Sequence, residues 1–387
     1  MALPLVAVSF TRSPVLVAGL ELVRTLPWLF GALPVGALVD RLDRRRTMLA
    51  ANVVRTTVVA ALSIAIGTGH GSLWMLYIAA LGTGIAEVFY DTAAQSLVPS
   101  IVERSRLDRA NGRLYAVELG AQELAGPPLA GVLVAAALAV SFATSAALWI
   151  VAIVVLLALR GRFRPIRERK SSTMRADIGE GMSFLLGRPV LRTMALMVGM
   201  TNLATSAVFA VLVLYAVGPD SAMQLTEPQF GLLFATIAAG ALVGGILAEH
   251  SQRRIGRANT LTLSVVGTAI YIATLAITAN VAAIATTAFV SGITMMMWNV
   301  TTVSFRQRVT PDHLLGRLNS TYRLIAWGTR PLGAAIGGVL GQLLGIRAVF
   351  AVMGILAAAM LVPNRHITEP ALEAAERDEP VVAGGEL

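Results

Sequence analysis

The chain has no cysteine, only four histidines and a single lysine, Lys170, in 387 residues. Without cysteine it can form no disulfide, no thiolate nucleophile and no cysteine-ligated metal site. The histidines are His70, His250, His313 and His366. All fall in expected loops or at span ends, which argues against a histidine proton relay inside a membrane. There is also no ATP-binding G-x-x-x-x-G-K-[ST] loop and no nucleophile paired with a base. We therefore expect no metal, no cofactor and no enzymatic activity.

Charge is scarce too. Charged residues make up 14% of the chain, against about 25% in soluble domains, whereas 56% of residues are hydrophobic and the mean hydropathy is +0.72. The apolar runs, such as residues 142–159 and 261–279, are about 20 residues long and apolar on all sides, which is typical of spanning helices rather than β-strands. Because a bilayer core offers backbone groups no hydrogen bonds, we predict an all-α membrane protein.

Eleven full spans are expected from the apolar runs. They cover residues 14–38, 48–67, 74–97, 111–138, 141–160, 190–217, 229–249, 259–278, 281–304, 319–343 and 345–363. Residues 1–10 are too short to cross about 30 Å of hydrocarbon. We therefore expect an incomplete first helix, with the true start of the protein upstream of Met1 or the chain truncated.

The loops between these spans alternate between arginine-rich and nearly base-free. The arginine-rich set comprises residues 41–46, 104–113, 160–175, 253–257 and 306–317. Basic loops stay in the cytoplasm, so the net charge of +9 indicates topology rather than nucleic-acid binding. The alternation of the loops predicts a multi-pass protein with a cytoplasmic C-terminus. Arginine in place of lysine, together with abundant alanine, favours a GC-rich bacterial genome, so we expect the membrane to be a bacterial inner membrane.

The chain also divides into two similar halves. The run at 36–45 aligns without gaps with the run at 245–254, and Pro127 aligns with Pro331 at the same offset as Gly112 with Gly316. Parallel repeats of this kind are typical of one class of transporters. The predicted domains are a first transmembrane bundle at 1–160, a basic cytoplasmic linker at 161–187, a second bundle at 188–364 and a polar tail at 365–387, which we expect to be disordered.

Residues 36–49 resemble the loop signature of the major facilitator superfamily. The matching positions of the gating motif are Gly36, Asp40, Arg41, Arg44 and Arg45. The resemblance implies two pseudo-symmetric six-helix bundles and a motif that closes the cytoplasmic side. Asp43 stands where the family has glycine, which leaves the geometry of that turn open. A generic basic loop is the alternative interpretation.

A second motif lies in the span at 111–138. Gly126, Pro127 and Gly131 resemble the core of the export motif of drug–proton antiporters, with Ala130 in place of a glycine. A proline kink with close helix packing is the alternative. The segments at 87–99, 111–119 and 310–317 resemble the branch of enterobactin-type exporters and macrolide-efflux-like proteins.

Charges within the spans need a reason, because each costs about 2.5–3.5 kcal/mol near the bilayer centre. The acids all lie in the first half. Glu87 and Asp91 share one helix face and are the first candidates for proton coupling, with Glu123 and Glu118 as further candidates. A structural pairing of Glu87 or Asp91 with a base such as Arg55 is the alternative.

Glu21 and Arg24 on the second span, three residues apart, favour a structural ion pair within one helix. In the second half, Arg323, Trp327 and Arg330 share a face. They are candidates for balancing the acids of the first half or for contacting an anionic substrate; an arginine reaching the membrane interface is the alternative. Met296 is another cavity candidate, with apolar helix packing as the alternative. Asn202 and Asn299 are polar residues in apolar spans, and we expect each to form an interhelical hydrogen bond or to act as a donor in the cavity.

The sequence thus predicts a secondary transporter, most consistent with proton-coupled efflux of a small amphipathic compound by a monomer whose partners are that substrate, protons and the lipid bilayer. A proton-coupled importer of a nutrient and a non-transporting membrane receptor stay open as alternatives.

Overall fold

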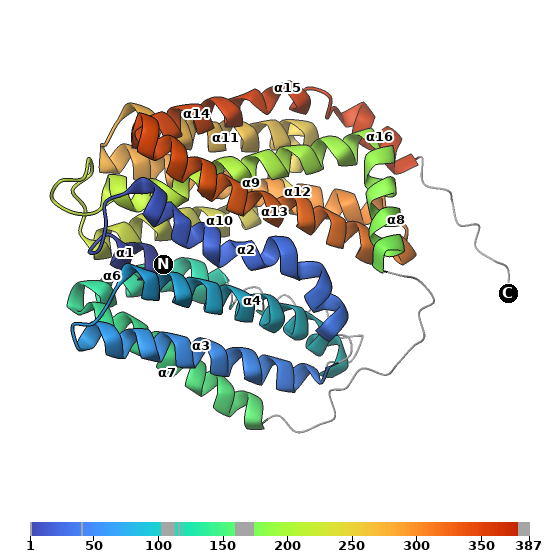
Figure 1. Ribbon diagram of the computed structural model, residues 1–387. Coiled ribbons are helices and arrows are strands. Elements are labelled where there is room, and N and C mark those ends of the chain that lie inside the picture. The colour runs from blue at the N-terminus through green and yellow to red at the C-terminus, as the bar shows by residue number, and fades with distance from the viewer. Residues whose placement is uncertain are drawn as a thin grey trace.

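The computed structural model describes residues 2–39, 42–101, 113, 114, 117, 119–158 and 174–377 of the chain. Over these residues the chain is helical, and the only extended pairing is an isolated bridge between Val217 and Leu225. Nine of the described helices are long and apolar enough to cross a bilayer, and the long helices run side by side in Figure 1. The predicted all-α membrane fold is confirmed.

Most helices follow the predicted spans, with two corrections. The break expected at Ser141 lies at Ala137, and the span expected at 345–363 is divided at Met360. In the first half they are α1 (Ala2–Ala7), α2 (Pro14–Val39), α3 (Arg44–Gly67), α4 (Leu73–Ile101), the π-helix η2 (Leu119–Ala125), α6 (Gly126–Ala136) and α7 (Leu138–Ala158). In the second half they are α8 (Met174–Gly187), α9 (Pro189–Ala216), α10 (Glu227–Ile255), α11 (Arg257–Ile277), α12 (Val281–Arg308), α13 (Asp312–Leu344), α14 (Ile346–Ala359), α15 (Leu361–Asn364) and α16 (Glu369–Arg377). Several helices continue past the apolar run at the arginine-rich end, because hydropathy locates the bilayer boundary and not the last helical residue.

Local sequence explains several helix ends. Gly256 and Gly345 have φ values of +84° and +87°, a region that favours glycine, and they separate α10 from α11 and α13 from α14. Asp43, which departs from the family's glycine, caps α3: its Oδ1 accepts a hydrogen bond from the backbone N–H of Arg46 at 3.0 Å. Asp43, in the place of the family's glycine, therefore stabilises the start of α3.

The two halves pack their helices in the same order. In the second half, neighbours follow the order α10, α12, α11, α14, α9 and α13; in the first half the corresponding order is α2, α4, α3, α7, α1 and α6. The halves meet where α2 packs on α13 and α6 packs on α10. This pseudo-symmetry is the predicted architecture, with the short α1 in the place of a complete helix.

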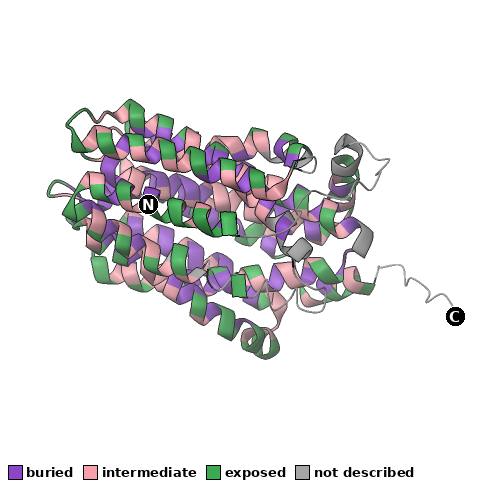
Figure 2. Ribbon diagram, turned by 90° about the horizontal axis from the view of Figure 1, so that it is seen from below, coloured by how far each residue is buried: buried purple, intermediate pink, exposed green. Residues whose placement is uncertain are grey.

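Burial follows a membrane pattern. Buried residues gather between the helices in Figure 2, and exposed residues cover much of the outer surface. Large apolar side chains are among the exposed ones: Ile246 is 81% exposed and Ile277 is 79% exposed. In water such a surface would be unfavourable, whereas in a bilayer it faces lipid.

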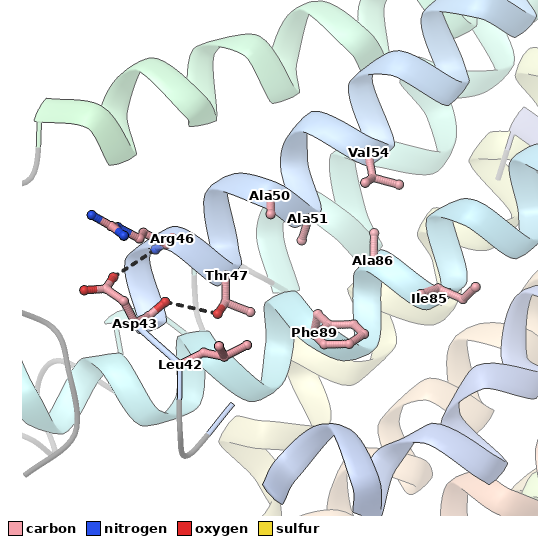
Figure 3. A pocket seen from close by; sticks show the side chains of 10 residues that line it. All are labelled: Leu42, Asp43, Arg46, Thr47, Ala50, Ala51, Val54, Ile85, Ala86 and Phe89. Atoms are coloured by element: carbon pink, nitrogen blue, oxygen red, sulfur yellow. Dashed lines mark hydrogen bonds between the residues drawn. The ribbon is translucent and has the colours of Figure 1, made fainter. Parts of the chain in front are cut away.

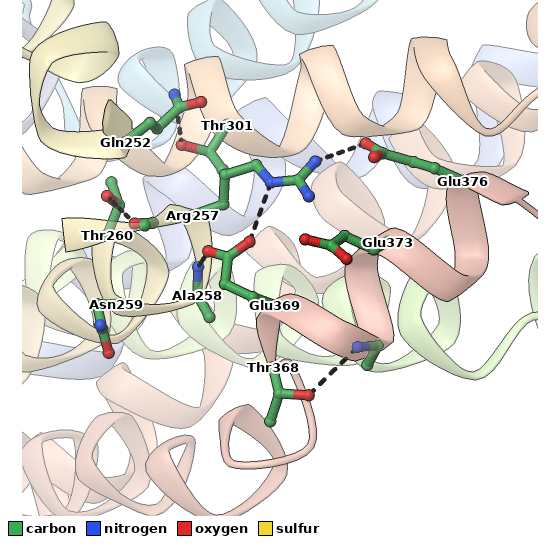
Figure 4. Close-up of polar contacts among 12 residues, drawn as sticks. Gln252, Arg257, Ala258, Asn259, Thr260, Thr301, Thr368, Glu369, Glu373 and Glu376 are labelled. Atoms are coloured by element: carbon green, nitrogen blue, oxygen red, sulfur yellow. Dashed lines mark hydrogen bonds and ion pairs between the residues drawn. The ribbon is translucent and has the colours of Figure 1, made fainter. Parts of the chain in front are cut away.

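The expected disorder of the tail is wrong for residues 369–377, which form α16. Arg257 pairs with Glu369 at 3.3 Å and with Glu376 at 2.6 Å (Figure 4). Arg308 also pairs with Glu376, at 2.8 Å. Leu372 is buried in the cluster formed by the arginine-rich ends of the second half. The acidic composition suggested a solvated tail. The acids Glu369 and Glu376 instead form ion pairs with these two arginines.

Candidate functional site

An ion-paired cluster joins α2 to α4 in the interior of the first half. Arg24 bonds to both carboxylate oxygens of Glu21, with Nε–Oε2 at 2.9 Å and Nη2–Oε1 at 2.8 Å, and its Nη1 donates to Glu87 Oε2 at 3.1 Å. All three side chains are between 24% and 29% exposed. The predicted pair of Glu21 with Arg24 is confirmed, and Glu87 proves to be its third member.

Close packing of the two helices brings Glu87 to Arg24. A Cβ built on Gly84 would lie 2.2 Å from the backbone oxygen of Arg24, so only glycine allows this approach. Glu87 lies three residues after Gly84 on α4, one helical turn further along. The pairing was missed from the sequence because it depends on how α2 lies against α4.

Arg55, on α3, completes the cluster from a third helix. It interacts electrostatically with Glu87 and Asp91, and its guanidinium lies 5.0 Å from the ring centroid of Tyr90 and 5.8 Å from that of Trp149. The alternative that Arg55 pairs structurally with these acids therefore has electrostatic support, but the hydrogen bond to Glu87 comes from Arg24.

On the opposite half, α13 presents the predicted residues to this cluster. Arg323 interacts electrostatically with Asp91, and Arg330 does so with Glu21. Trp327 packs on Trp28 of α2 with ring centroids 4.9 Å apart. The structure thus brings together the acids of the first half and the arginines of the second, as the sequence suggested. Trp28 was missed because nothing local marks it as a partner of Trp327.

Hydrogen bonds to backbone oxygens of α13 hold this stretch in place. Asn202 on α9 donates to the backbone oxygen of Ala326 at 2.7 Å, and Ser206 donates to that of Arg330 at 2.8 Å. Asn202 is therefore an interhelical hydrogen-bond donor, one of the two roles considered for polar residues in apolar spans. The two acceptors lie on either side of Trp327 in the sequence, so these bonds hold this part of α13 against α9.

Other predicted residues lie apart from the cluster or beyond what is described. On α12, Met296 is buried and in van der Waals range of Gly245, which favours packing, whereas Asn299 is exposed. Glu118 lies outside the described residues. The backbone at Glu123 belongs to η2, a π-helix of the kind often found at functional sites, but the description does not include its side chain.

The gating motif is described in part. Gly36 lies in α2, whereas Asp40 and Arg41 fall outside the described residues. Arg45 donates from Nε to the backbone oxygen of Leu156 and from Nη2 to that of Leu157, both at 2.7 Å. A cation there stabilises the carbonyl end of α7. Arg44 begins α3 beside it.

The export-type motif forms a contact between the halves. Pro127 lies at the start of α6, and Gly126 is its first residue. A Cβ on Gly131 would lie 2.3 Å from the backbone oxygen of Glu227, and a Cβ on Gly231 would lie 2.3 Å from that of Pro127. These two glycines let the backbones of α6 and α10 come into contact. The geometry therefore agrees with close helix packing, the alternative interpretation of this motif.

The base-poor ends of the two halves are joined. Arg12 Nη1 donates to the backbone oxygen of Val217 at 2.9 Å, and Ser13 Oγ donates to Gln342 Oε1 at 2.9 Å. These bonds and the α6–α10 contact lie at the same end of the molecule. The structure is therefore closed on the side that the arginine-poor loops occupy.

Two pockets lie beside α4. One of about 450 Å³ opens between α3 and α4 (Figure 3), and one of about 310 Å³ lies between α2 and α4; Ile85 and Phe89 line both. Ile85 shares its helix face with Ile78 and Leu81, and all three are between 41% and 65% exposed. These three side chains are apolar, and neither pocket is lined by Glu21, Arg24 or Glu87. No group of metal-ligating side chains occurs within the described part of the chain.

Comparison with known proteins places this geometry in context. The chain matches the model of the MFS_3 family, described as transmembrane secretion effectors, over residues 2–382. The multidrug efflux pump Tap of Mycolicibacterium fortuitum is 26% identical over 350 residues, covering 84% of this chain and 80% of Tap. The enterobactin exporter EntS of Salmonella choleraesuis is 28% identical over 322 residues, covering 81% of this chain and 74% of EntS.

Solved structures agree on the fold. The nucleoside transporter NupG has a TM-score of 0.69 at 13% identity and covers 97% of this chain and 93% of NupG. An inward-facing bacterial homologue of the iron transporter ferroportin has a TM-score of 0.68 at 19% identity, with coverage of 97% and 93%. At these identities the likeness extends to the fold alone.

Proposed function

Because the chain belongs to the MFS_3 family of transmembrane secretion effectors, we propose that it is a secondary transporter that exports a small amphipathic compound, such as a drug, antibiotic or siderophore, in exchange for protons. The observation that carries this proposal is the ion-paired cluster of Glu21, Arg24 and Glu87 inside two spanning helices. Efflux by relatives at 26% and 28% identity supports the outward direction.

Glu87 and Asp91 are the proposed proton-coupling groups. A proton on Glu87 would remove its charge and weaken its bond to Arg24, which would then pair with Glu21 alone. Because Glu87 and Arg24 stand on different helices, this change alters how α4 is held to α2. Asp91 interacts electrostatically with Arg323 of the other half, so its protonation would weaken an attraction between the halves.

The cycle would be alternating access, with the two halves rocking about the cluster. In the state described, the arginine-poor ends are joined by Arg12 and Ser13. We propose that this is the external side, so that the transporter here faces the cytoplasm, in a bacterial inner membrane and with the C-terminus inside. The division into bundles at 1–160 and 188–364 with a linker at 161–187, and a monomeric state, belong to the same proposal.

Everted membrane vesicles test the function directly. With an imposed proton gradient, ethidium and a catecholate siderophore are added as probes, and collapse of the gradient is followed with a pH-sensitive dye. Wild-type protein should collapse the gradient on adding at least one probe, and Glu87→Gln should not. The matched control is Glu373→Gln, since that acid pairs with Arg377 of its own helix and both side chains are more than half exposed. Equal responses from wild type and Glu87→Gln would refute the assigned coupling role.

A further inference from the structure

Two tryptophans from opposite halves of the molecule lie between two arginines. The guanidinium of Arg323 lies 5.8 Å from the ring centroid of Trp28, and that of Arg330 lies 5.0 Å from the ring centroid of Trp327. The two indoles are themselves 4.9 Å apart and tilted by 45°. We call this row of four side chains the Arg–Trp row. It crosses the boundary between α2 and α13.

The row lies at the contact between the two halves. Arg323 is exposed and lies four residues inside the apolar run at 319–343, which is about 6 Å along the helix. A charge within a spanning segment is unfavourable against hydrocarbon, and this one interacts with Asp91 of the opposite half. An exposed side chain that is attracted to the other half lies at the boundary between the two halves.

One polar atom of the row has no partner. The indole N–H of Trp28 is buried, in a side chain that is only 6% exposed, and it donates no hydrogen bond within the described structure. A buried donor without an acceptor is unfavourable and calls for an explanation. An acceptor atom on a bound molecule would satisfy it.

We propose that the Arg–Trp row is the part of the substrate site that contacts the transported molecule, and that it selects aromatic anions. This rests on the proposed transport function. An aromatic ring stacks on indoles, and a carboxylate or phenolate pairs with a guanidinium and accepts from the Trp28 N–H.

The charge around the row favours anions over cations. Arg323 and Arg330 already occupy the positive positions beside the indole rings, where a cationic drug would otherwise lie. With the cluster of the first half included, the described surroundings of the row hold four arginines, Arg24, Arg55, Arg323 and Arg330, against three acids, Glu21, Glu87 and Asp91. An anion leaving a cell with a negative interior also moves down the electrical gradient, in line with export.

Binding to the purified full chain in lipid nanodiscs tests the selectivity. Isothermal titration calorimetry compares 2-naphthoate with 2-naphthylmethylamine, which keeps the ring and reverses the charge, and with decahydro-2-naphthoate, which keeps the charge and loses the aromaticity. We expect 2-naphthoate to bind about tenfold more tightly than either. Arg330→Gln should abolish the preference for the anion, and Trp327→Leu the preference for the aromatic ring.

Two further variants separate binding from folding. Arg347→Gln removes another arginine over an aromatic ring, 6.0 Å from Tyr215 and on α14, and should leave binding unchanged. Trp327→Phe keeps an aromatic face and should keep the aromatic preference if Trp327→Leu fails to fold. Equal binding of all three compounds, or a preference that survives both Arg330→Gln and Trp327→Leu, overturns the proposal.

The proposed function can fail separately. If ethidium still exchanges for protons in vesicles while 2-naphthoate shows no preference, the substrate inference is wrong and the transporter assignment stands. If 2-naphthoate binds through Arg330 but no probe exchanges for protons, the binding inference stands and proton antiport is wrong.

Discussion

Arg24 donates a hydrogen bond to Glu87 across 3.1 Å, and this bond connects α2 with α4. The same guanidinium neutralises Glu21 one turn away. Replacing it by Arg24→Gln would leave two carboxylates partly buried among apolar helices without their cation. Removing one partner of a buried pair costs about 3–5 kcal/mol, so the unfolding temperature should fall clearly.

Thermal unfolding in detergent, followed by size-exclusion chromatography with tryptophan fluorescence, measures the loss. The double variant Arg24→Gln with Glu87→Gln removes one of the two stranded charges and should be more stable than Arg24→Gln alone. A double variant no more stable than the single one would mean that Glu87 does not depend on Arg24.

Gly131→Val should break the contact between α6 and α10. A Cβ at this position meets the backbone oxygen of Glu227 at 2.3 Å, and backbone cannot move aside as a flexible side chain can. The halves should separate at this end, and transport should fall about tenfold or more. Gly179→Ala is the control, since a Cβ there meets nothing within 4 Å.

Accessibility of a thiol reports that separation. The chain has no native cysteine, so Leu233→Cys on α10 introduces a single reactive thiol. Leu233 is buried, with 3% of its surface exposed. The introduced thiol should react faster with a membrane-impermeant maleimide in the Gly131→Val background. Unchanged labelling together with normal transport would show that the close contact has no part in closing this end.

Interactions between sequence neighbours could be predicted, and interactions between distant segments could not. The pair of Glu21 with Arg24 follows from helical spacing alone, and the spans follow from hydropathy because a bilayer imposes their length. Glu87 joins that pair only because Gly84 lets α4 lie against the backbone of Arg24. No pattern within either helix encodes that approach.

The same limit explains the tail and the tryptophans. Composition predicted disorder for residues 369–377, because an acidic segment cannot bury apolar area by itself; its partners Arg257 and Arg308 lie on other helices. Trp28 and Trp327 are 299 residues apart in sequence, and their contact depends on how α2 meets α13. Asp43 shows the opposite case, where a local cap was visible in the sequence but read only as a departure from a motif.

Cross-linking Ser13 to Gln342 should lock the transporter with its arginine-poor ends joined. These side chains hydrogen-bond at 2.9 Å across the two halves, so Ser13→Cys with Gln342→Cys brings two thiols within reach of a short bis-methanethiosulfonate reagent. Transport should stop on treatment and return on reduction, because alternating access requires this end to open. Gln342→Cys alone should be insensitive, and continued transport by the cross-linked protein would contradict rocking of the halves at this contact.

Glu376 should make the docking of α16 sensitive to acid. Burial alone would raise the pKa of this carboxyl, but hydrogen bonds from Arg308 and Arg257 outweigh it and leave the pKa below its usual value of 4.5. A carboxyl whose folded pKa is lowered stabilises the folded state above its unfolded pKa and loses that contribution as pH falls through the folded pKa. The helix should therefore stay docked at neutral pH and loosen only below about pH 4.5.

Hydrogen–deuterium exchange of residues 369–377, corrected for the intrinsic effect of pH, measures this docking. Glu376→Gln removes a charge that two arginines share, so about 1.5–3 kcal/mol should be lost and exchange at neutral pH should rise by about tenfold or more. Glu373→Gln is the matched control, because Glu373 pairs only with Arg377 of its own helix among the described ion pairs, with both side chains more than half exposed, and such pairs contribute little. If Glu376→Gln exchanges no faster than Glu373→Gln, then apolar burial around Leu372, rather than the arginine pairs, holds α16 in place.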